Sequence, residues 1–234
     1  MLLALWSPKG GSGTSIVAAA CAVVLARHCG ARLVDLDGDQ PAIFGLAAEP
    51  DIGILDWLAL GPEAPTDALN RVALHAAPGL ALIPRGVERT LAPVASAEAG
   101  AALAVALRDD GLSAIADLGT ARTPATRAVG EVADASIIVV RGCYLALRRA
   151  VHAPLLEHTT GVVLLEEPGR SLGAGEIAEV LGRPVLATMP VRESIARAVD
   201  AGVITSRLPE PLARPAARLL GRIQMLAGPR GAVA

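Results

Sequence analysis

A glycine-rich loop near the start of the chain lies between two apolar segments and constrains the fold more than any other feature. Residues 2–6 are Leu-Leu-Ala-Leu-Trp, residues 9–13 are Lys-Gly-Gly-Ser-Gly, and an apolar run covers residues 16–26. Glycines let the main chain curl without a Cβ in the way, and the start of a helix presents N–H donors with partial positive charge. The pattern therefore predicts a strand, a phosphate-binding loop and a helix in direct succession.

Short segments rich in Ala, Val, Leu and Ile recur along the chain, separated by helical or Gly/Pro-rich sequence. This alternation is typical of an α/β fold, a doubly wound and mostly parallel sheet flanked by helices. We predict one domain over 1–227 and a frayed tail at 228–234. Strands are expected at 2–6, 32–35, 80–84, 113–117, 135–140, 161–165 and 184–189, and helices at 14–28, 95–109 and 212–226, with short helices within 40–60.

Composition excludes several classes of protein. The chain is 53% hydrophobic but only 2% aromatic, so its core must be built from small aliphatic side chains. A net charge of −2 gives no overall nucleic-acid footprint. The longest apolar run has 11 residues, from 16 to 26, whereas a membrane span needs about 20. Three cysteines and four histidines lack disulfide or zinc spacing. We therefore expect a cytoplasmic protein.

The loop departs twice from the common phosphate-binding pattern G-x-x-x-x-G-K-[ST]. Pro8 occupies the first glycine position, and Thr14 occupies the lysine position. The second change matters more, because that lysine normally neutralises charge on the β- and γ-phosphates. Ser15 retains the hydroxyl that would bind Mg²⁺.

Three aspartates are expected at strand ends. Asp35 and Asp37 follow the second strand, and Asp117 ends the segment 113–117. Ligands of open α/β sheets bind beyond the carboxyl ends of the strands, so these side chains should meet the glycine-rich loop. Asp117 would hold Mg²⁺, directly or through water, and Asp37 would also orient the attacking water.

A dinucleotide-binding site is the competing interpretation of the same loop. Gly11 and Gly13, with Asp35 about 20 residues later, imitate that fingerprint. However, Ile16 stands at the third glycine position, and this interpretation explains neither Lys9 nor the acid at the end of segment 113–117. Each feature alone is also common as a plain turn or cap; their joint occurrence favours the phosphate site.

Taken together, these residues resemble the ParA/MinD family of deviant-Walker ATPases. The family pattern K-G-G-x-G-K-[ST] is matched by residues 9–15 except at Thr14. Further similar segments lie at 34–37, 116–119, 133–140, 189–192 and 201–202, so the resemblance spans roughly residues 1–205.

The resemblance implies ATP or ADP bound with Mg²⁺, and a nucleotide-dependent homodimer. Lys9 would be the signature lysine that reaches the partner's phosphates, and Lys9 and Asp37 would be catalytic. Ser15, Asp37 and Asp117 would bind Mg²⁺. The residues that would contact the nucleotide are Lys9, Gly10, Gly11, Ser12, Gly13, Thr14, Ser15, Pro190 and Val191.

Two departures from the family point to weak nucleotide binding and slow or absent hydrolysis. Thr14 removes the loop lysine, and Leu165-Glu166 stands where many members have an asparagine that reads adenine. Loss of the lysine, and Pro8 before Lys9, resemble the TadZ/CpaE-like branch, which positions Flp/Tad pilus machinery at the cell pole. Members of that branch often carry an N-terminal receiver-like domain, which these 234 residues do not include. The alternatives are a ParA-like DNA-partition role, a MinD-like septum-site role and a nucleotide-independent scaffold.

Two segments of the sequence suit contact with a partner. Residues 212–226 form a basic amphipathic pattern, which suits peripheral membrane contact or, as we prefer, packing of a final helix. Arg148 and Arg149, with Arg141 nearby, would suit DNA phosphates or, as we prefer, a solvated helix face. Tyr144 in the same region suits either a partner contact or packing. The apolar residues of the C-terminal pattern are Leu219, Leu220, Ile223 and Leu226, and the basic ones Arg214, Arg218 and Arg222.

Overall fold

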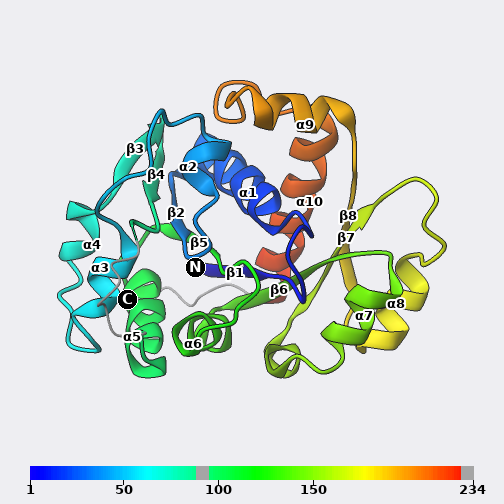
Figure 1. Ribbon diagram of the computed structural model, residues 1–234, viewed down its shortest axis with the longest axis horizontal. Helices are drawn as coiled ribbons and strands as arrows, with labels where there is room; N and C mark the ends of the chain where they lie inside the picture. Colours follow the sequence, from blue (N-terminus) through cyan, green and yellow to red (C-terminus); the bar gives the residue numbers. More distant parts are fainter. Residues whose placement is uncertain (88–94, 228–234) are drawn as a thin grey trace.

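One sheet of eight strands organises the computed structural model, which describes residues 1–87 and 95–227 (Figure 1). The strand order is β3-β4-β2-β5-β1-β6-β7-β8, and all neighbours are parallel except β3 and β4. The predicted tail at 228–234 lies outside the described residues. The strands are β1 Leu2–Trp6, β2 Ala31–Asp35, β3 Leu74–Ala77, β4 Leu80–Ile83, β5 Ser113–Asp117, β6 Ala135–Arg141, β7 Gly161–Glu166 and β8 Val185–Pro190.

The seven predicted strands are confirmed, each with bounds shifted by one residue or less. The eighth strand, β3, was not predicted from the sequence. It has only four residues, pairs antiparallel at the edge of the sheet, and leaves Leu74 39% exposed. A segment reading Leu-His-Ala-Ala carries neither a buried apolar run nor a regular alternation, so the usual strand signal is missing.

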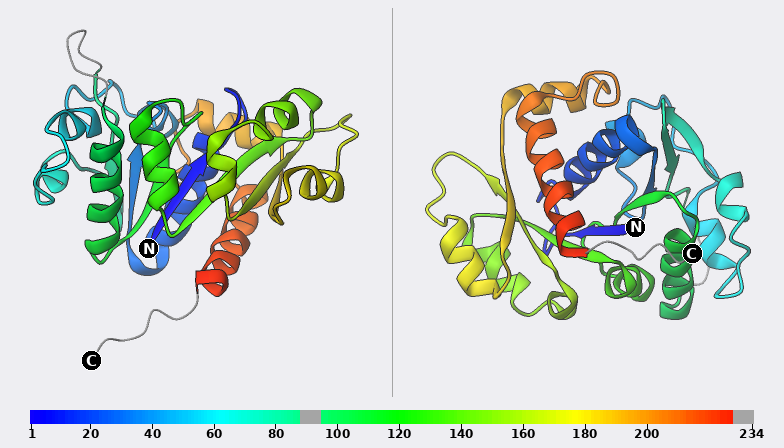
Figure 2. Two further views of the ribbon diagram at one scale, coloured as in Figure 1. Left: turned by 90° about the horizontal axis from the view of Figure 1, so that it is seen from below. Right: turned by 180° about the vertical axis from the view of Figure 1, so that it is seen from behind.

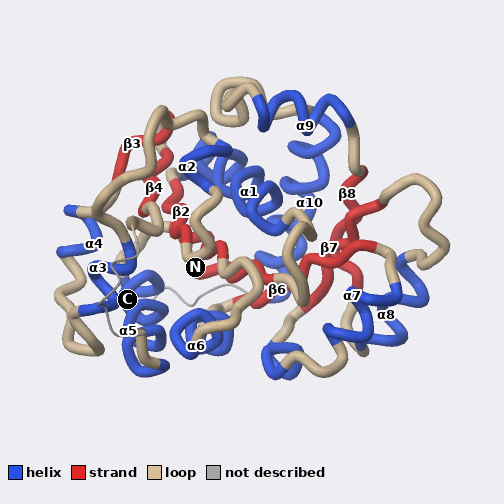
Figure 3. The backbone as a smooth tube through the Cα atoms, in the orientation of Figure 1, coloured by secondary structure: helices blue, strands red, loops and turns tan. Residues whose placement is uncertain are grey.

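The helices connect these strands (Figure 3). The predicted long helices at 14–28, 95–109 and 212–226 are confirmed as α1, α5 and α10, with slightly different ends, and short helices occur within 40–60 as expected. The described helices are α1 Thr14–Cys29, α2 Gln40–Ile43, α3 Ile54–Ala59, α4 Ala68–Arg71, α5 Ala97–Asp109, α6 Pro124–Val132, α7 Tyr144–Ala150, η1 Pro154–His158, α8 Ala174–Leu181, α9 Glu193–Asp200 and α10 Glu210–Ala227.

Helices cover both faces of the sheet, as a doubly wound fold requires (Figures 1 and 2). Side chains of a strand alternate between faces, so Leu3 and Leu5 of β1 join a core with α1, α2, α9 and α10. Leu2, Ala4 and Trp6 join a second core, to which the helices from α3 to α8 contribute. Because both faces are covered, the strands are continuous apolar runs rather than alternating ones.

Helix α1 is buried on nearly all sides. Its residues from Val17 to Leu25 are at most 8% exposed, because the helix lies between the sheet and α10. A helix that is apolar all round is a core helix. The small side chains of this segment, mostly Ala and Val, allow the two packed layers to approach it closely.

The preferred interpretation of α10 as a packing helix is confirmed. Leu219, Leu220 and Ile223 are at most 4% exposed and pack toward α1 and β8, so they are not available to a membrane surface. Leu226 does not belong to this buried stripe, since it is 60% exposed where the end of α10 projects beyond the sheet (Figure 2). No helix in the described ranges has the length and apolar character to cross a membrane.

The connections of β1 and β5 leave the centre of the sheet in opposite directions. The chain passes from β1 through α1 to β2 on one side, and from β5 through α6 to β6 on the other. Helices α1 and α6 accordingly cover opposite faces. Such a switch point opens a crevice at the carboxyl ends of the strands, and the glycine-rich loop after β1 lies there.

The burial of α1 predicts that Cys21 is chemically inert in the folded protein. Cys21 is 0% exposed, and burial raises the pKa of its thiol to about 12, so little reactive thiolate forms at pH 8. In a Cys29→Ser/Cys143→Ser variant, Ellman's reagent should therefore modify Cys21 only after denaturant is added. As the matched control, the exposed Cys29 should react with the reagent at once in the Cys21→Ser/Cys143→Ser variant. Rapid native labelling of Cys21 would contradict the fold.

Candidate functional site

A cavity of about 520 Å³ lies at the carboxyl end of β1. Seven of the predicted site residues line it, whereas Lys9, Asp117, Pro190 and Val191 do not. The lining consists of Ser7, Gly10, Gly11, Ser12, Gly13, Thr14, Ser15, Ile16, Asp37, Asp39, Ala42, Ile43, Gly119, Thr120, Arg141, Val199 and Asp200.

The loop is curled and its donors are free. Gly11 and Gly13 have φ values of 72° and 85°, a left-handed region that other residues adopt at a cost. The carbonyl of Lys9 accepts hydrogen bonds from the hydroxyls of Ser7 (3.0 Å) and Ser12 (2.9 Å), which hold the curl. None of the N–H groups of residues 10–15 donates to another described residue. A row of unpartnered donors at the start of a helix suits an anion.

Lys9 does not turn into the cavity of its own chain. Its Nζ donates to the carbonyl of the adjacent Gly10 at 3.2 Å, in an exposed position. The lysine therefore lies at the rim of the loop, and its predicted role toward a second chain stays a prediction.

Asp35 has a structural position rather than one in the cavity. Its side chain is 0% exposed and accepts hydrogen bonds from the N–H groups of Asp37 (3.1 Å), Gly38 (2.7 Å) and Gln40 (3.0 Å). Burial raises the pKa of this carboxyl to about 6, although the three backbone donors oppose the shift. Asp35 thus shapes the turn after β2, which carries the next two aspartates to the cavity.

Asp37 reaches the cavity, as predicted, and packs against Gly119. A Cβ added at Gly119 would overlap the carboxylate of Asp37, so an alanine there would have to displace the end of that side chain. Partial burial and the neighbouring charge of Asp39 raise the pKa of Asp37, while Arg85 and Arg122 oppose the shift.

Asp117 lies behind the loop and is 0% exposed. Its carboxylate accepts hydrogen bonds from Gln40 Nε2 (2.8 Å) and from the N–H of Gly119 (3.1 Å). Gln40 Nε2 also donates to the carbonyl of Ser15 at 3.0 Å, which ties the start of α1 to the end of β5. Burial, and then the charge of Asp35, raise the pKa of Asp117 to about 7.

The hydroxyl and carboxylate oxygens at this edge of the sheet fit a magnesium ion only together with a phosphate. Ser15 Oγ donates to Asp39 Oδ2 at 3.4 Å, and Asp37 lines the same cavity. Within the described ranges, no group of three His, Cys, Asp or Glu residues is arranged to hold a metal ion. Magnesium is commonly held by one or two carboxylates together with substrate phosphates and water. The free N–H groups of the loop fit such a phosphate.

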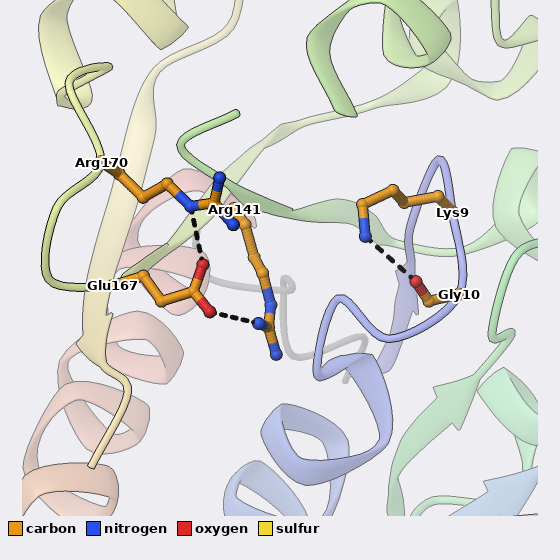
Figure 4. Close-up of polar contacts among 5 residues, drawn as sticks. All are labelled: Lys9, Gly10, Arg141, Glu167 and Arg170. Atoms are coloured by element: carbon orange, nitrogen blue, oxygen red, sulfur yellow. Dashed lines mark hydrogen bonds and ion pairs between the residues drawn. The ribbon is translucent and has the colours of Figure 1, made fainter. Parts of the chain in front are cut away.

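A second cavity, of about 340 Å³, lies beside the first and contains the two predicted adenine contacts. Pro190 and Val191 line it, together with residues of the loop after β7. Glu167 in that loop pairs with Arg141 (2.6 Å) and with Arg170 (2.9 Å) (Figure 4). The hydrogen bond from Arg170, followed by the charges of Arg141 and Arg170, lowers the pKa of the Glu167 carboxyl. The pair links the borders of the two cavities.

Three residues of this region were not predicted as part of the site, although Arg141 was named as a contact for DNA phosphates. Asp39 completes an alternating series with Asp35 and Asp37, so the spacing was available as a signal. Arg141 ends β6, and the strand-end rule applied to Asp117 would also have selected it. Gln40 had no signal, because a single glutamine after a turn matches no motif.

The contact between Gly119 and Asp37 predicts a measurable strain. Gly119→Ala should cost about 1 to 2 kcal/mol for a left-handed alanine, plus about 0.5 to 1.5 kcal/mol for displacing the Asp37 carboxylate from its rotamer. Gly182→Ala is the matched control, since Gly182 has a similar φ (59° against 54°) and open space around it. Urea unfolding should show that Asp37→Ala reduces the cost of Gly119→Ala to that of Gly182→Ala. Equal costs for both alanines in the wild-type background would refute the contact.

The buried Asp117 predicts a pH dependence in protein free of nucleotide and magnesium. Its pKa rises from 3.8 to about 7 on folding, so the folded state binds the proton more tightly. The associated stability is present at low pH and is lost as the pH rises through this window. Asp117→Asn should flatten the fall in unfolding free energy between pH 5 and 8, leaving the smaller part due to Asp35. Asp109→Asn, at an exposed position, should leave the fall unchanged; an identical effect of both variants would count against the burial of Asp117.

Comparison with known proteins gives distant curated relatives. No protein-family model matches the chain. Two uncharacterized proteins of Mycobacterium tuberculosis, Rv3660c of strain H37Rv and MT3760 of strain CDC 1551, are each 30% identical over 231 residues. The alignments cover 94% of this chain but 63% of each relative, so the chain spans less than two thirds of the length of the curated relatives it matches.

Solved structures match the whole fold. A ParA family ATPase from Chlorobium tepidum has a TM-score of 0.77 at 21% identity, over 96% of this chain and 98% of that one. MinD from Pyrococcus horikoshii, complexed with Mg-ADP, has a TM-score of 0.78 at 18% identity, over 99% of both chains. An ATP complex of a variant of McdA from Cyanothece has a TM-score of 0.73 at 18% identity, over 100% of this chain and 98% of that one. The predicted fold class is therefore confirmed: this chain has the fold of the ParA/MinD P-loop NTPases.

Proposed function

We propose that this protein is a nucleotide-binding positioning protein of the ParA/MinD type, with ATP or ADP and Mg²⁺ as its ligands. The observation that carries the proposal is the row of free N–H donors over residues 10–15, at the start of α1 and at the switch point of the sheet. Two similar solved structures hold Mg-ADP and ATP, which supports the same ligands here.

The altered loop supports weak binding and slow or absent hydrolysis. Thr14 lines the phosphate cavity where a lysine would supply a positive charge, and its hydroxyl is buried with no partner among the described residues. Ser15 and Asp37 remain to hold Mg²⁺ with the phosphates, while Asp117 would act through water or after a rearrangement of its bond to Gln40. Pro190 and Val191 would contact the base in the second cavity.

The proposed signalling state is a homodimer. Lys9 lies at the rim of the loop and outside the cavity of its own chain, which suits a contact with the phosphates of a second chain. We further propose a pilus-positioning role of the TadZ/CpaE-like kind, at the pole or at the membrane surface, on the basis of Thr14 and Pro8. The similarity to MinD, which forms a complex with MinC in Aquifex aeolicus, supports action through a protein partner.

Restoring the loop lysine should strengthen nucleotide binding. Thr14→Lys adds a charge-assisted contact, and we expect Mg-ATP to bind on the order of 10- to 100-fold more tightly in calorimetry, with faster hydrolysis. Thr66→Lys makes the same substitution at an exposed loop position and should change neither the affinity for Mg-ATP nor the rate of hydrolysis.

Lys9→Ala should abolish ATP-dependent dimerisation, which light scattering can measure.

Two outcomes would support other functions. If neither the wild type nor Thr14→Lys binds Mg-ATP, the protein is a nucleotide-independent scaffold that keeps the fold. Arg148 and Arg149 are exposed on α7 and make no ion pair with a described residue, so a partition role also has a defined test. A salt-sensitive shift of non-specific DNA that Arg148→Glu weakens would favour that role.

A further inference from the structure

The phosphate cavity has one cation in its lining. Among the described residues that line it, Asp37, Asp39 and Asp200 are acidic and Arg141 alone is basic. Lys9 lies outside this lining, and Arg85 and Arg122 act on Asp37 from outside it. A polyphosphate needs compensating positive charge in a partly enclosed site, and Thr14 supplies none.

The geometry of Arg141 suits that need. The residue ends β6, the strand next to β1, so its side chain starts from the same edge of the sheet as the glycine-rich loop. Figure 4 shows this side chain running past Arg170, with its guanidinium beside Glu167 on the side that faces the start of α1. The Nη1 atom is paired with Glu167, whereas Nε is buried with no partner among the described residues.

Glu167 ties this cation to the neighbouring cavity. Its carboxylate accepts from Arg141 and from Arg170, and Glu167 itself lines the cavity that contains Pro190 and Val191. Arg141 lines the phosphate cavity only, and Glu167 the neighbouring one only. The ion pair therefore spans the boundary between the two cavities.

We propose that Arg141 is the phosphate-binding cation that replaces, from β6 of the same chain, the lysine missing at Thr14, and that Glu167 holds it when no nucleotide is bound. This inference rests on the proposed nucleotide-binding function. Arg141 would thus give the site its specificity for phosphate from β6, a different element from the glycine-rich loop.

Calorimetric titration of the full chain with Mg-ATP, Mg-ADP and AMP tests the role of Arg141. Arg141→Ala should weaken Mg-ATP binding on the order of 10- to 100-fold and should lower the ratio of ATP to AMP affinity. If Arg141 had a purely structural role, its removal would weaken the binding of all three nucleotides alike. Arg218→Ala removes the same charge from an exposed position on α10, outside both cavities, and should bind all three nucleotides as the wild type does.

A rescue variant tests the substitution of one cation for another. In the Arg141→Ala background, Thr14→Lys should restore Mg-ATP affinity to at least the wild-type level, because either cation then serves the phosphates. Glu167→Gln keeps Arg141 but removes its competing charge, and should tighten Mg-ATP binding roughly 2- to 5-fold. This variant also keeps the test decisive if Arg141→Ala fails to fold.

The possible results distinguish the role of Arg141 from the nucleotide-binding function itself. Three outcomes would each overturn the role of Arg141 while leaving the nucleotide site in place. Arg141→Ala could bind Mg-ATP as the wild type does, it could lose affinity equally for all three nucleotides, or Glu167→Gln could bind Mg-ATP no more tightly than the wild type. A wild type that binds no Mg-ATP, even with Thr14→Lys added, would overturn the proposed function and this inference together.

Discussion

The site depends on the central position of β1. Because β1 lies between β5 and β6, the connections on its two sides leave in opposite directions, and a crevice opens at the edge between them. The glycine-rich loop fills that edge, and the burial of α1 beneath α10 fixes the direction of its free N–H groups. Each neighbouring strand then contributes one charged residue beside the loop: Asp117 from β5 and Arg141 from β6. A shift of one strand would separate all of these groups.

Asp35 and Asp117, two fully buried carboxylates of this region, form no ion pair with a described residue. Burial raises the pKa of Asp35 to about 6 and that of Asp117 to about 7, since a buried carboxylate without a positive partner is costly. Gln40 satisfies Asp117 with a neutral amide instead of a charge. Within the described ranges no three His, Cys, Asp or Glu side chains form a metal cage, so a magnesium ion here would need phosphate or water oxygens as further ligands.

Sequence patterns predicted most of this fold, because its strands are buried on both faces and bounded by Gly or Pro. The same patterns failed at β3, which is short, exposed and at the edge. For the site, the glycine-rich loop and Asp37 were predictable from local sequence alone. The burial of Asp117 behind Gln40 depends on a contact between residues 77 positions apart, and the withdrawal of Asp35 into a turn depends on the direction of its side chain. Such contacts leave no periodic signal.

Moving the phosphate-binding charge from α1 to β6 would change what the site responds to. A lysine at the start of α1 is fixed by the loop itself, so it meets any phosphate that binds there. Arg141 is instead held by Glu167, and Glu167 belongs to the loop after β7 that also borders the proposed base cavity. A nucleotide that fills both cavities would act on both ends of this ion pair, whereas free phosphate would act on one. If Arg141 serves in this way, the altered loop binds phosphate less tightly than a lysine-containing loop but selects more strongly for a complete nucleotide.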